Sequence, residues 1–254
     1  MTDIYLTGAT ALAASLLVLW IISIMRGHVS FIDAFWGTGF LIAAGAGATT
    51  LPALGPAQTL VLALLAAWSV RLSLYLIRRY LAHGEDPRYV KIIGARTGVS
   101  RHVFTAWFVF GMQGALILVI AAPVMGLLAE PARGLDGWAY AGAALWALGA
   151  FFEWVGDWQL SRFKADPLSE GKVLDTGLWA WTRHPNYFGD ACVWWGLWLI
   201  GHDLTLVFAP ALMTFLLMKW SGVPLLERSL KKRRPGYADY IKRTSAFFPK
   251  PPKR

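Results

Sequence analysis

Long apolar stretches separated by short polar ones form the dominant pattern of this 254-residue chain. A helix that crosses the hydrocarbon of a bilayer needs about 20 mainly apolar residues, and seven runs approach or reach that length. These runs occupy residues 4–25, 31–50, 58–80, 104–128, 135–160, 186–202 and 204–221. His202 and Asp203 leave only a minimal turn between the last two. The pattern therefore predicts an all-α integral membrane protein with seven transmembrane helices.

The basic residues give this arrangement a direction, because cytoplasmic loops are enriched in Lys and Arg. Of the 24 basic residues, 22 lie in four polar segments, namely residues 26–30, 78–103, 161–185 and the tail from Lys219. Only Arg133 lies in the opposite loops, and Arg71 lies within a span. The alternation predicts an N-terminus outside and a cytoplasmic C-terminus. The tail itself is expected to form a cytoplasmic helix followed by an extended end, in contact with anionic headgroups or with a cofactor.

Composition supports a membrane location. Hydrophobic residues make up 56% of the chain and charged residues 15%, whereas a soluble domain has roughly a quarter of its residues charged. The net charge of +9 does not indicate nucleic-acid binding, because the basic residues lie between apolar spans. The single cysteine, Cys192, excludes a disulfide framework. We expect a monomeric, multi-pass protein among membrane lipids, in the bacterial inner membrane or in the endoplasmic reticulum of a eukaryote.

Two acidic residues in the fifth span form the first candidate site. Glu153 and Asp157 are four residues apart, so they share one face of a helix near its cytoplasmic end. Basic residues follow at Arg162, Lys164 and Lys172. One interpretation is an exposed helix end paired with neighbouring lysines. The other is a cofactor site in which carboxylates accept hydrogen bonds from ribose or amide groups and cations hold phosphates.

A second candidate is the polar run Arg183-His184-Pro185-Asn186-Tyr187 before the sixth span. Proline favours the first turn of a helix, so Pro185 predicts the start of that helix, whose free N–H groups attract anions. A basic cytoplasmic loop explains Arg183 alone. It does not explain Asn186 and Asp190, which are one turn apart and are expected to face inward. We expect Arg183 and His184 to face phosphates and the latter two to face neutral polar groups.

A third candidate is Asp33, near the cytoplasmic start of the second span. One interpretation is that Ser30 or Asp33 caps that helix in the ordinary way. Alternatively, Asp33 is a proton donor or hydrogen-bond partner in an aromatic cavity, with Arg71 as its counter-ion, since a buried arginine must be paired. The segment HGEDPRYVKIIG, residues 83–94, is either a connector or a lid that uses Tyr89 over a bound cofactor.

The stretches GLWAWTRHPNYFGD, EWVGDWQLSRFK and YADYIKRTSAFFP resemble the steroid 5α-reductase family, in particular its bacterial 3-oxo-5α-steroid 4-dehydrogenase homologues of the DUF1295 type. The resemblance covers residues 140–254 well and the first half mainly in topology. It implies one membrane-embedded domain over residues 1–254. Residues 1–130 would lie mainly on the substrate side, and residues 135–254 would hold mainly the NADPH site. The implied activity is reduction of the Δ4 double bond of a 3-keto steroid.

The resemblance also assigns residues. It implies cofactor-binding roles for a set drawn from the fifth span, the sixth span and the tail: Glu153, Asp157, Lys164, Lys172, Arg183, His184, Asn186, Tyr187, Asp190, Tyr237, Tyr240 and Lys242. The tail lacks a histidine and a tyrosine of the family, with Glu227 and Arg233 as rough substitutes. The family grips the substrate carbonyl with a glutamate on the second helix and a tyrosine on the third. The implied catalytic set is Asp33, Trp68, Arg71 and Tyr75, where alignment puts the tyrosine at Trp68 and Tyr75 is an off-register substitute.

In the implied reaction a hydride adds to the β-carbon of an enone, and Asp33 (if protonated) or Trp68 stabilises the charge on the oxygen. The rival activity is a methyltransferase that uses S-adenosylmethionine, since similar arginine-histidine-proline motifs occur in isoprenylcysteine carboxyl methyltransferases. Phosphates need several cations, and this chain provides them around residues 162–183. A reductase of another sterol or of an enoyl lipid, and a lipid-binding or transport protein, are further alternatives.

Overall fold

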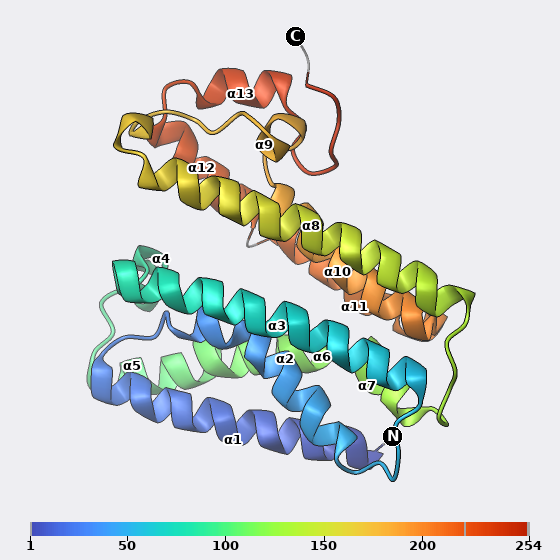
Figure 1. Ribbon diagram of the computed structural model, residues 1–254. Coiled ribbons are helices and arrows are strands. Elements are labelled where there is room, and N and C mark those ends of the chain that lie inside the picture. Colours follow the sequence, from blue (N-terminus) through green and yellow to red (C-terminus); the bar gives the residue numbers. More distant parts are fainter. Residues whose placement is uncertain (1, 221, 253–254) are drawn as a thin grey trace. The chain divides into compact units, whose positions relative to one another are not determined.

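The computed structural model describes residues 2–220 and 222–252, and all of their regular secondary structure is helical. The chain divides into two compact units, Met1–Asp136 and Gly137–Arg254. The described residues form no strand, and their one isolated β-bridge joins Thr182 to Ser245. Each unit is described by itself (Figure 1).

The first unit is built from seven α-helices and one π-helical segment. They are α1 (Thr2–Arg26), α2 (Ile32–Ala48), α3 (Pro56–His83), α4 (Pro87–Ile93), α5 (Gly98–Phe104), η1 (Thr105–Gly111), α6 (Met112–Ile120) and α7 (Ala122–Ala129). The short helix α2 packs between α1 and α3. Small residues make this contact close: a Cβ atom on Gly37 would lie 2.8 Å from the Ser69 carbonyl oxygen.

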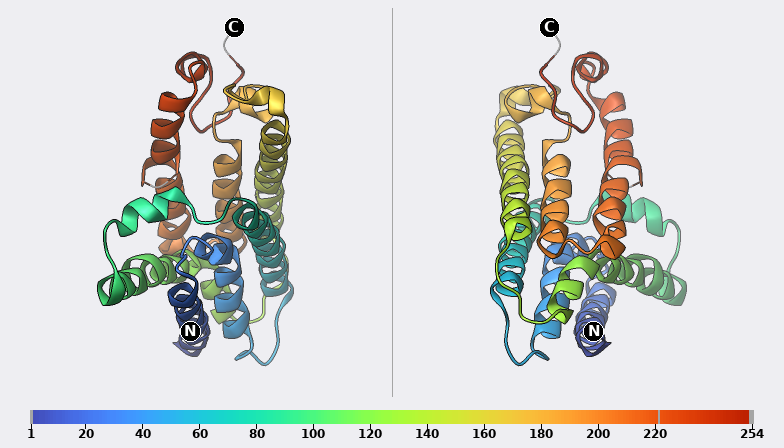
Figure 2. Two further views of the ribbon diagram at one scale, coloured as in Figure 1. Left: turned by 90° about the vertical axis from the view of Figure 1, so that its left-hand side faces the viewer. Right: turned by 90° about the vertical axis from the view of Figure 1, so that its right-hand side faces the viewer.

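The second unit consists of α8 (Gly137–Ala165), η2 (Pro167–Ser169), α9 (Leu178–Trp181), α10 (Pro185–Gly201), η3 (Leu204–Leu206), α11 (Phe208–Phe215), η4 (Leu216–Trp220), α12 (Val223–Arg233) and α13 (Tyr237–Arg243). Within it, α10 lies between α8 and α11 (Figure 2). Helix α10 begins at Pro185, as the sequence predicts. The predicted tail helix is two helices, because Arg234–Gly236 interrupts it.

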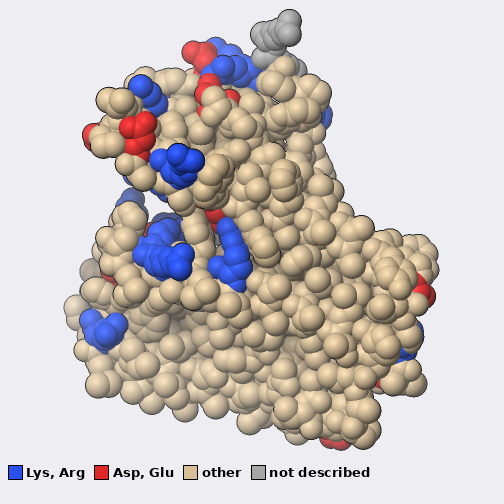
Figure 3. Space-filling view, viewed as in Figure 1, with Lys and Arg blue, Asp and Glu red and all other residues tan. Residues whose placement is uncertain are grey.

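The predicted spans are helical over most of their length, and three helices are long and apolar enough to cross a membrane. These three are Thr2–Arg26, Pro56–His83 and Gly98–Ile120, and Ile32–Ala48 and Leu204–Trp220 are shorter apolar helices. By length and composition the molecule is therefore a membrane protein. On the face shown in Figure 3, most of the visible Lys and Arg residues of the first unit lie near the end of α3 and around α4, and a broad surface beside them shows no charged residue. The predicted connector of residues 83–94 is largely helical, because Asp86 caps α4 and Pro87 starts it.

Helices α8 and α10 pack through glycines spaced seven residues apart. Gly142 and Gly149 of α8 face Gly196 and Gly189 of α10. A Cβ atom on Gly149 would lie 2.5 Å from the Gly189 carbonyl oxygen and 2.6 Å from the Val193 nitrogen. Both neighbours are backbone atoms and cannot move aside. This close packing holds Glu153 and Asp157 of α8 against the start of α10.

We expect Gly149→Ala to lower the free energy of unfolding by about 1–3 kcal/mol, because the added methyl group overlaps a helix backbone. Thermal unfolding in detergent, followed by circular dichroism, measures the change. Gly45→Ala is the matched control, since nothing lies within 4 Å of the added atom, and alanine is the better helix former. Equal melting temperatures for the two variants would contradict the packing argument.

Candidate functional site

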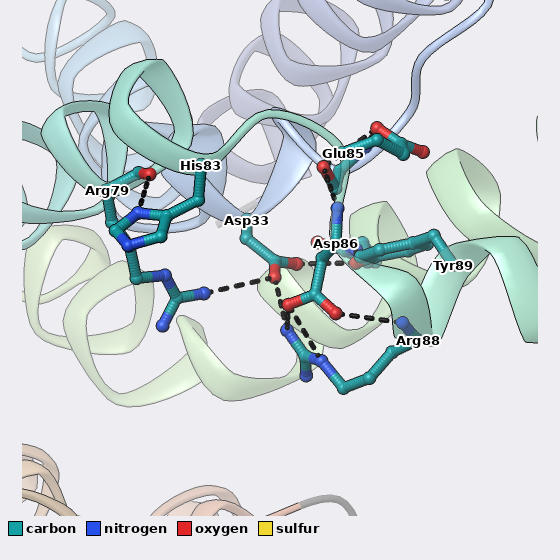
Figure 4. Close-up of polar contacts among 9 residues, drawn as sticks. Asp33, Arg79, His83, Glu85, Asp86, Arg88 and Tyr89 are labelled. Carbon is teal, nitrogen blue, oxygen red and sulfur yellow. Dashed lines mark hydrogen bonds and ion pairs between the residues drawn. The ribbon is translucent and has the colours of Figure 1, made fainter. Parts of the chain in front are cut away.

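Asp33, in the first turn of α2, lies at the centre of a polar cluster in the first unit (Figure 4). The Tyr89 hydroxyl donates to Asp33 Oδ1 at 2.5 Å, and Arg88 Nη2 donates to Asp33 Oδ2 at 2.9 Å. Arg79 Nη2 is 3.9 Å from the same Oδ2. On the far side of the phenol, Gln113 Nε2 donates to Tyr89 Oη at 3.0 Å. We call these five residues the Asp33 cluster.

Glu85 fixes the loop that carries Arg88 and Tyr89. Its carboxylate accepts hydrogen bonds from the backbone N–H groups of Val29 and Ser30, each at 3.0 Å, and from Ser30 Oγ at 2.8 Å. Ser30 Oγ in turn accepts a hydrogen bond from the Asp86 N–H at 3.0 Å. Glu85, rather than Ser30 or Asp33, therefore satisfies the backbone groups just before α2. The α3–α4 loop is tied to the start of α2, and this places Tyr89 on Asp33.

The electrostatics of the Asp33 cluster keep the Tyr89 hydroxyl protonated. Tyr89 is 8% exposed. Burial raises the pKa of this phenol, and the negative charge of Asp33 raises it further. Arg88 and the Gln113 amide act in the opposite direction but are outweighed. Tyr89 is therefore a fixed hydrogen-bond donor at neutral pH.

One sequence-based assignment around Asp33 is wrong. The expected counter-ion, Arg71, does not pair with Asp33; its guanidinium lies 5.2 Å from the ring centre of Tyr75. Thr38 and Ser73, whose hydroxyl oxygens are 2.8 Å apart, set the register of α2 against α3. Helices α2 and α3 are antiparallel, so Arg71, two residues before Ser73, lies level with the part of α2 that follows Thr38. Asp33 comes before Thr38, and the two side chains are therefore separated by more than one helical turn. Arg71 is also half-buried rather than enclosed.

Trp68, the expected carbonyl donor, lies in the core of the first unit, and its catalytic role stays a prediction. Its side chain is fully buried and meets the Phe40 ring edge-on at 5.8 Å. Tyr75 lies with Arg71 on a surface groove of α3. The tyrosine that reaches Asp33 is Tyr89, from the segment that the sequence suggested as a connector or a lid. A spacing argument along α3 cannot find it, because Tyr89 comes from the next helix.

In the second unit, the buried Arg183 joins the loop before α10 to the C-terminal tail. Its Nε donates to Glu227 Oε1 at 2.8 Å, and its Nη1 donates to the carbonyl oxygens of Ile241 at 3.2 Å and Thr244 at 2.5 Å. His184 Nε2 is 3.2 Å from the same Glu227 oxygen. Arg183, His184 and Glu227 form the Glu227 cluster, with Arg183 8% and His184 1% exposed. Arg183 thus binds the tail, and the sequence-based prediction that it also faces phosphates stays a prediction.

Backbone contacts extend this attachment. The Arg183 N–H donates to the Ser245 carbonyl at 2.8 Å, and Thr182 Oγ1 donates to the Phe247 carbonyl at 2.8 Å. The Lys250 N–H donates to the Trp181 carbonyl at 2.9 Å. The extended end that the sequence predicted therefore runs along residues 181–183.

Ionisation in the Glu227 cluster follows from its contacts. Burial opposes ionisation of Glu227, but hydrogen bonds from His184 and Arg183 outweigh it and lower the pKa of this carboxyl to about 2. Burial lowers the pKa of His184, against the pull of Glu227. At neutral pH the cluster therefore holds a carboxylate, a guanidinium and a neutral imidazole whose Nε2 carries the proton.

A basic pocket lies beside the Glu227 cluster, within the second unit. It has a volume of about 90 Å³, room for roughly three waters or one phosphate-sized group. Its polar lining consists of four cations and two phenols: Lys164, Lys172, Arg183, Arg234, Tyr237 and Tyr240. Arg234 Nη1 is buried and makes no hydrogen bond to the described residues. The pocket is therefore suited to an anion of phosphate size.

The other predicted cofactor residues take several positions. Glu153 and Asp157 are buried between α8 and α10, and Asn186 Nδ2 donates to Asp157 Oδ1 at 3.0 Å. Asp190, one turn after Asn186, is half-buried. The first interpretation of the acidic pair, an exposed helix end, is therefore wrong.

Three further predicted residues, Tyr187, Tyr240 and Lys242, have contacts of their own. Tyr187 stacks on His184 with ring centres 5.4 Å apart. Tyr240 donates its hydroxyl proton to the Trp179 carbonyl at 2.5 Å. Lys242 is 78% exposed, pairs with Asp239 and does not line the pocket. The pocket instead includes Arg234, which the sequence did not single out because it lies within a run of basic residues.

Comparison with known proteins identifies a family but no activity. The family model described as "Protein of unknown function (DUF1295)" matches residues 19–244. A curated relative, the uncharacterized protein C594.04c of Schizosaccharomyces pombe, is 24% identical, over 92% of this chain and 76% of that protein. No solved structure matches the chain significantly.

Glu227→Gln tests the electrostatic attachment of the tail. Removing one partner of a buried ion pair leaves Arg183 uncompensated, so we expect a loss of about 3 kcal/mol of stability at pH 7. Because its folded pKa lies below the ordinary 4.5, the Glu227 contribution is complete above pH 4.5 and is lost as the pH falls towards 2. That acid-dependent component should be missing in the variant. Thermal unfolding from pH 7 to pH 3 measures both effects.

Asp239→Asn is the matched control for this test. Asp239 also pairs with a basic residue of the tail, but both partners are about three-quarters exposed, and such pairs contribute little. We expect no measurable change in melting temperature, and no change in trypsin cleavage of the tail. Equal behaviour of the two variants would show that the Glu227 cluster does not hold the tail.

Proposed function

This chain belongs to the DUF1295 family of proteins of unknown function, and we propose that it is an integral membrane reductase that uses NADPH to reduce a lipid enone. The proposed substrate class is a 3-oxo-Δ4-steroid or a similar sterol-like lipid. The proposal combines the resemblance to steroid 5α-reductases with the chemistry of the Asp33 cluster and the basic pocket. It includes seven spans, with the N-terminus outside and the C-terminus cytoplasmic.

The observation that carries the proposal is the basic pocket. NADPH has a pyrophosphate and a 2′-phosphate, whereas S-adenosylmethionine has no phosphate. Four cations around a space of about 90 Å³ fit one phosphate group, and the unsatisfied Arg234 Nη1 is a donor for it. Lys164 and Lys172 add two positive charges from the end of α8 and the following loop. This charge favours NADPH over the rival methyl donor.

The buried polar residues between α8 and α10 are the proposed partners of the uncharged parts of the cofactor. Glu153, Asp157, Asn186 and Asp190 provide carboxylate and amide oxygens, which accept hydrogen bonds from ribose hydroxyls or a carboxamide. The glycines of the α8–α10 contact keep these side chains close together. Bound NADPH would supply the hydride that adds to the β-carbon of the enone.

The Asp33 cluster is the proposed site for the substrate carbonyl. When a hydride adds to an enone, negative charge develops on the carbonyl oxygen, and a fixed donor stabilises it. Tyr89 is such a donor, since its hydroxyl is protonated and points at Asp33. An arriving carbonyl oxygen would take this hydrogen bond from Asp33, whose charge remains compensated by Arg88. The α-carbon then takes a proton from solvent, which completes the reduction.

Cofactor binding is the first test. Purified protein should bind NADPH, measured by the change in nicotinamide fluorescence, and Lys172→Glu should weaken binding by about tenfold or more. Lys231→Glu is the control, because Lys231 is exposed on α12 and does not line the pocket. Binding of S-adenosylmethionine but not NADPH would overturn the proposal in favour of a methyltransferase, and binding of neither would favour a lipid-binding protein.

Removal of the Tyr89 hydroxyl tests the carbonyl site. We expect Tyr89→Phe to lower kcat for a 3-oxo-Δ4-steroid by about 10²-fold or more, with NADPH affinity unchanged. Tyr80→Phe is the matched control, since the Tyr80 hydroxyl lies 3.3 Å from His28 Nδ1 at the surface and makes no contact with Asp33. Product formation, followed by chromatography, measures turnover. Full activity of Tyr89→Phe would exclude Tyr89 as the donor.

A further inference from the structure

Gln113 is a polar residue in an otherwise apolar helix. It lies in α6, Met112–Ile120, whose sequence is MQGALILVI, within the fourth predicted span. A polar side chain in such a segment is costly unless it has a partner or a function. Its amide nitrogen has one: Nε2 donates to Tyr89 Oη at 3.0 Å.

The Tyr89 oxygen is thus held from two sides. It donates its proton to Asp33 on α2 and accepts one from Gln113 on α6. The two contacts differ in kind, because the proton given to Asp33 can turn to another acceptor, whereas the amide N–H keeps the oxygen in place. The charged neighbours of this phenol are Asp33, Arg79, Asp86 and Arg88, which come from α2, α3 and the start of α4.

We infer that Gln113 is a positioning residue for Tyr89: its amide N–H fixes the phenol oxygen while the Tyr89 hydroxyl turns its hydrogen bond from Asp33 to the substrate carbonyl. This role rests on the proposed reductase function. A donor on the phenol oxygen also makes its O–H a stronger donor, since chained hydrogen bonds polarise one another. The amide further stabilises negative charge on that oxygen, and it accordingly lowers the pKa of Tyr89 against the effects of burial and Asp33.

Gln113→Leu removes the donor and keeps a side chain of similar size. We expect kcat for a 3-oxo-Δ4-steroid to fall by about tenfold, with KM and NADPH affinity nearly unchanged. Gln113→Glu should give a different signature. As a carboxylate it cannot donate, but as a carboxylic acid it can, so its activity relative to wild type should rise as the pH falls. The other charged groups around Tyr89 are present in both the variant and the wild type. The ratio of their activities therefore reports the ionisation of residue 113 alone.

Gln58→Leu is the matched control. Gln58 is 2% exposed in the same unit, and its amide donates to the carbonyls of Leu127, Glu130 and Pro131. This substitution should lower the melting temperature, yet leave kcat of the folded protein and its pH profile unchanged. A tenfold loss of kcat in both glutamine variants would overturn the inference, because it would reduce Gln113 to a residue that only supports the fold.

A readout without turnover separates this inference from the proposed function. A ring-fluorinated tyrosine at position 89 reports its hydroxyl environment by fluorine NMR and is more acidic than tyrosine. Loss of the Gln113 donor should shift its signal and raise its pKa by about one unit. An unchanged signal and titration in Gln113→Leu would overturn the inference. If the shift occurs and no enone is reduced, the contact stands and the proposed function fails.

Discussion

The Arg183 guanidinium is buried where its charge needs compensation, and the second unit is arranged around that need. One ion pair with Glu227 and two hydrogen bonds to the carbonyls of Ile241 and Thr244 provide it. These partners come from α12 and from the end of α13, so compensation of one charge brings both tail helices onto the loop before α10. The basic pocket depends on this attachment, because three of its lining residues, Arg234, Tyr237 and Tyr240, belong to the tail. A residue that the sequence presents as an anion ligand thus builds the wall of an anion pocket.

In the first unit it is a negative charge, that of the Asp33 carboxylate, that needs compensation. Asp33 is an acidic residue in the first turn of an apolar helix, and Arg88, Arg79 and Tyr89 surround it. These groups neutralise the carboxylate without enclosing it: the side chain remains 23% exposed. A buried carboxylate with no access would be a structural residue, and a fully solvated one would not orient a phenol. Partial exposure beside a buried, protonated tyrosine suits the carbonyl site that we propose.

The sequence predicted helices well because apolar runs bounded by Pro, Gly and basic residues determine them locally. Pro185 marks the start of α10, and the i, i+4 spacing of Glu153 and Asp157 places both on a buried face. Partners distant in the chain were harder to predict. Asp33 and Tyr89 are 56 residues apart, and their contact depends on the α2–α3 register and on Glu85. Alignment along α3 therefore reached Trp68, which packs in the core, and missed the next helix. The seven-span count and the activity stay predictions.

The hydrogen bonds of Glu85 bear on the order in which the first unit assembles. The backbone groups just before α2 are satisfied by a side chain that is made more than 50 residues later. While the chain is being synthesised, those N–H groups have only water as a partner until α3 has formed and returned beside α2. The Asp33 cluster consequently cannot exist in a nascent chain that carries the first two helices alone. Formation of the α2–α3 hairpin is thus a precondition for the site, and the contact from Gln113 is added only when α6 has been made.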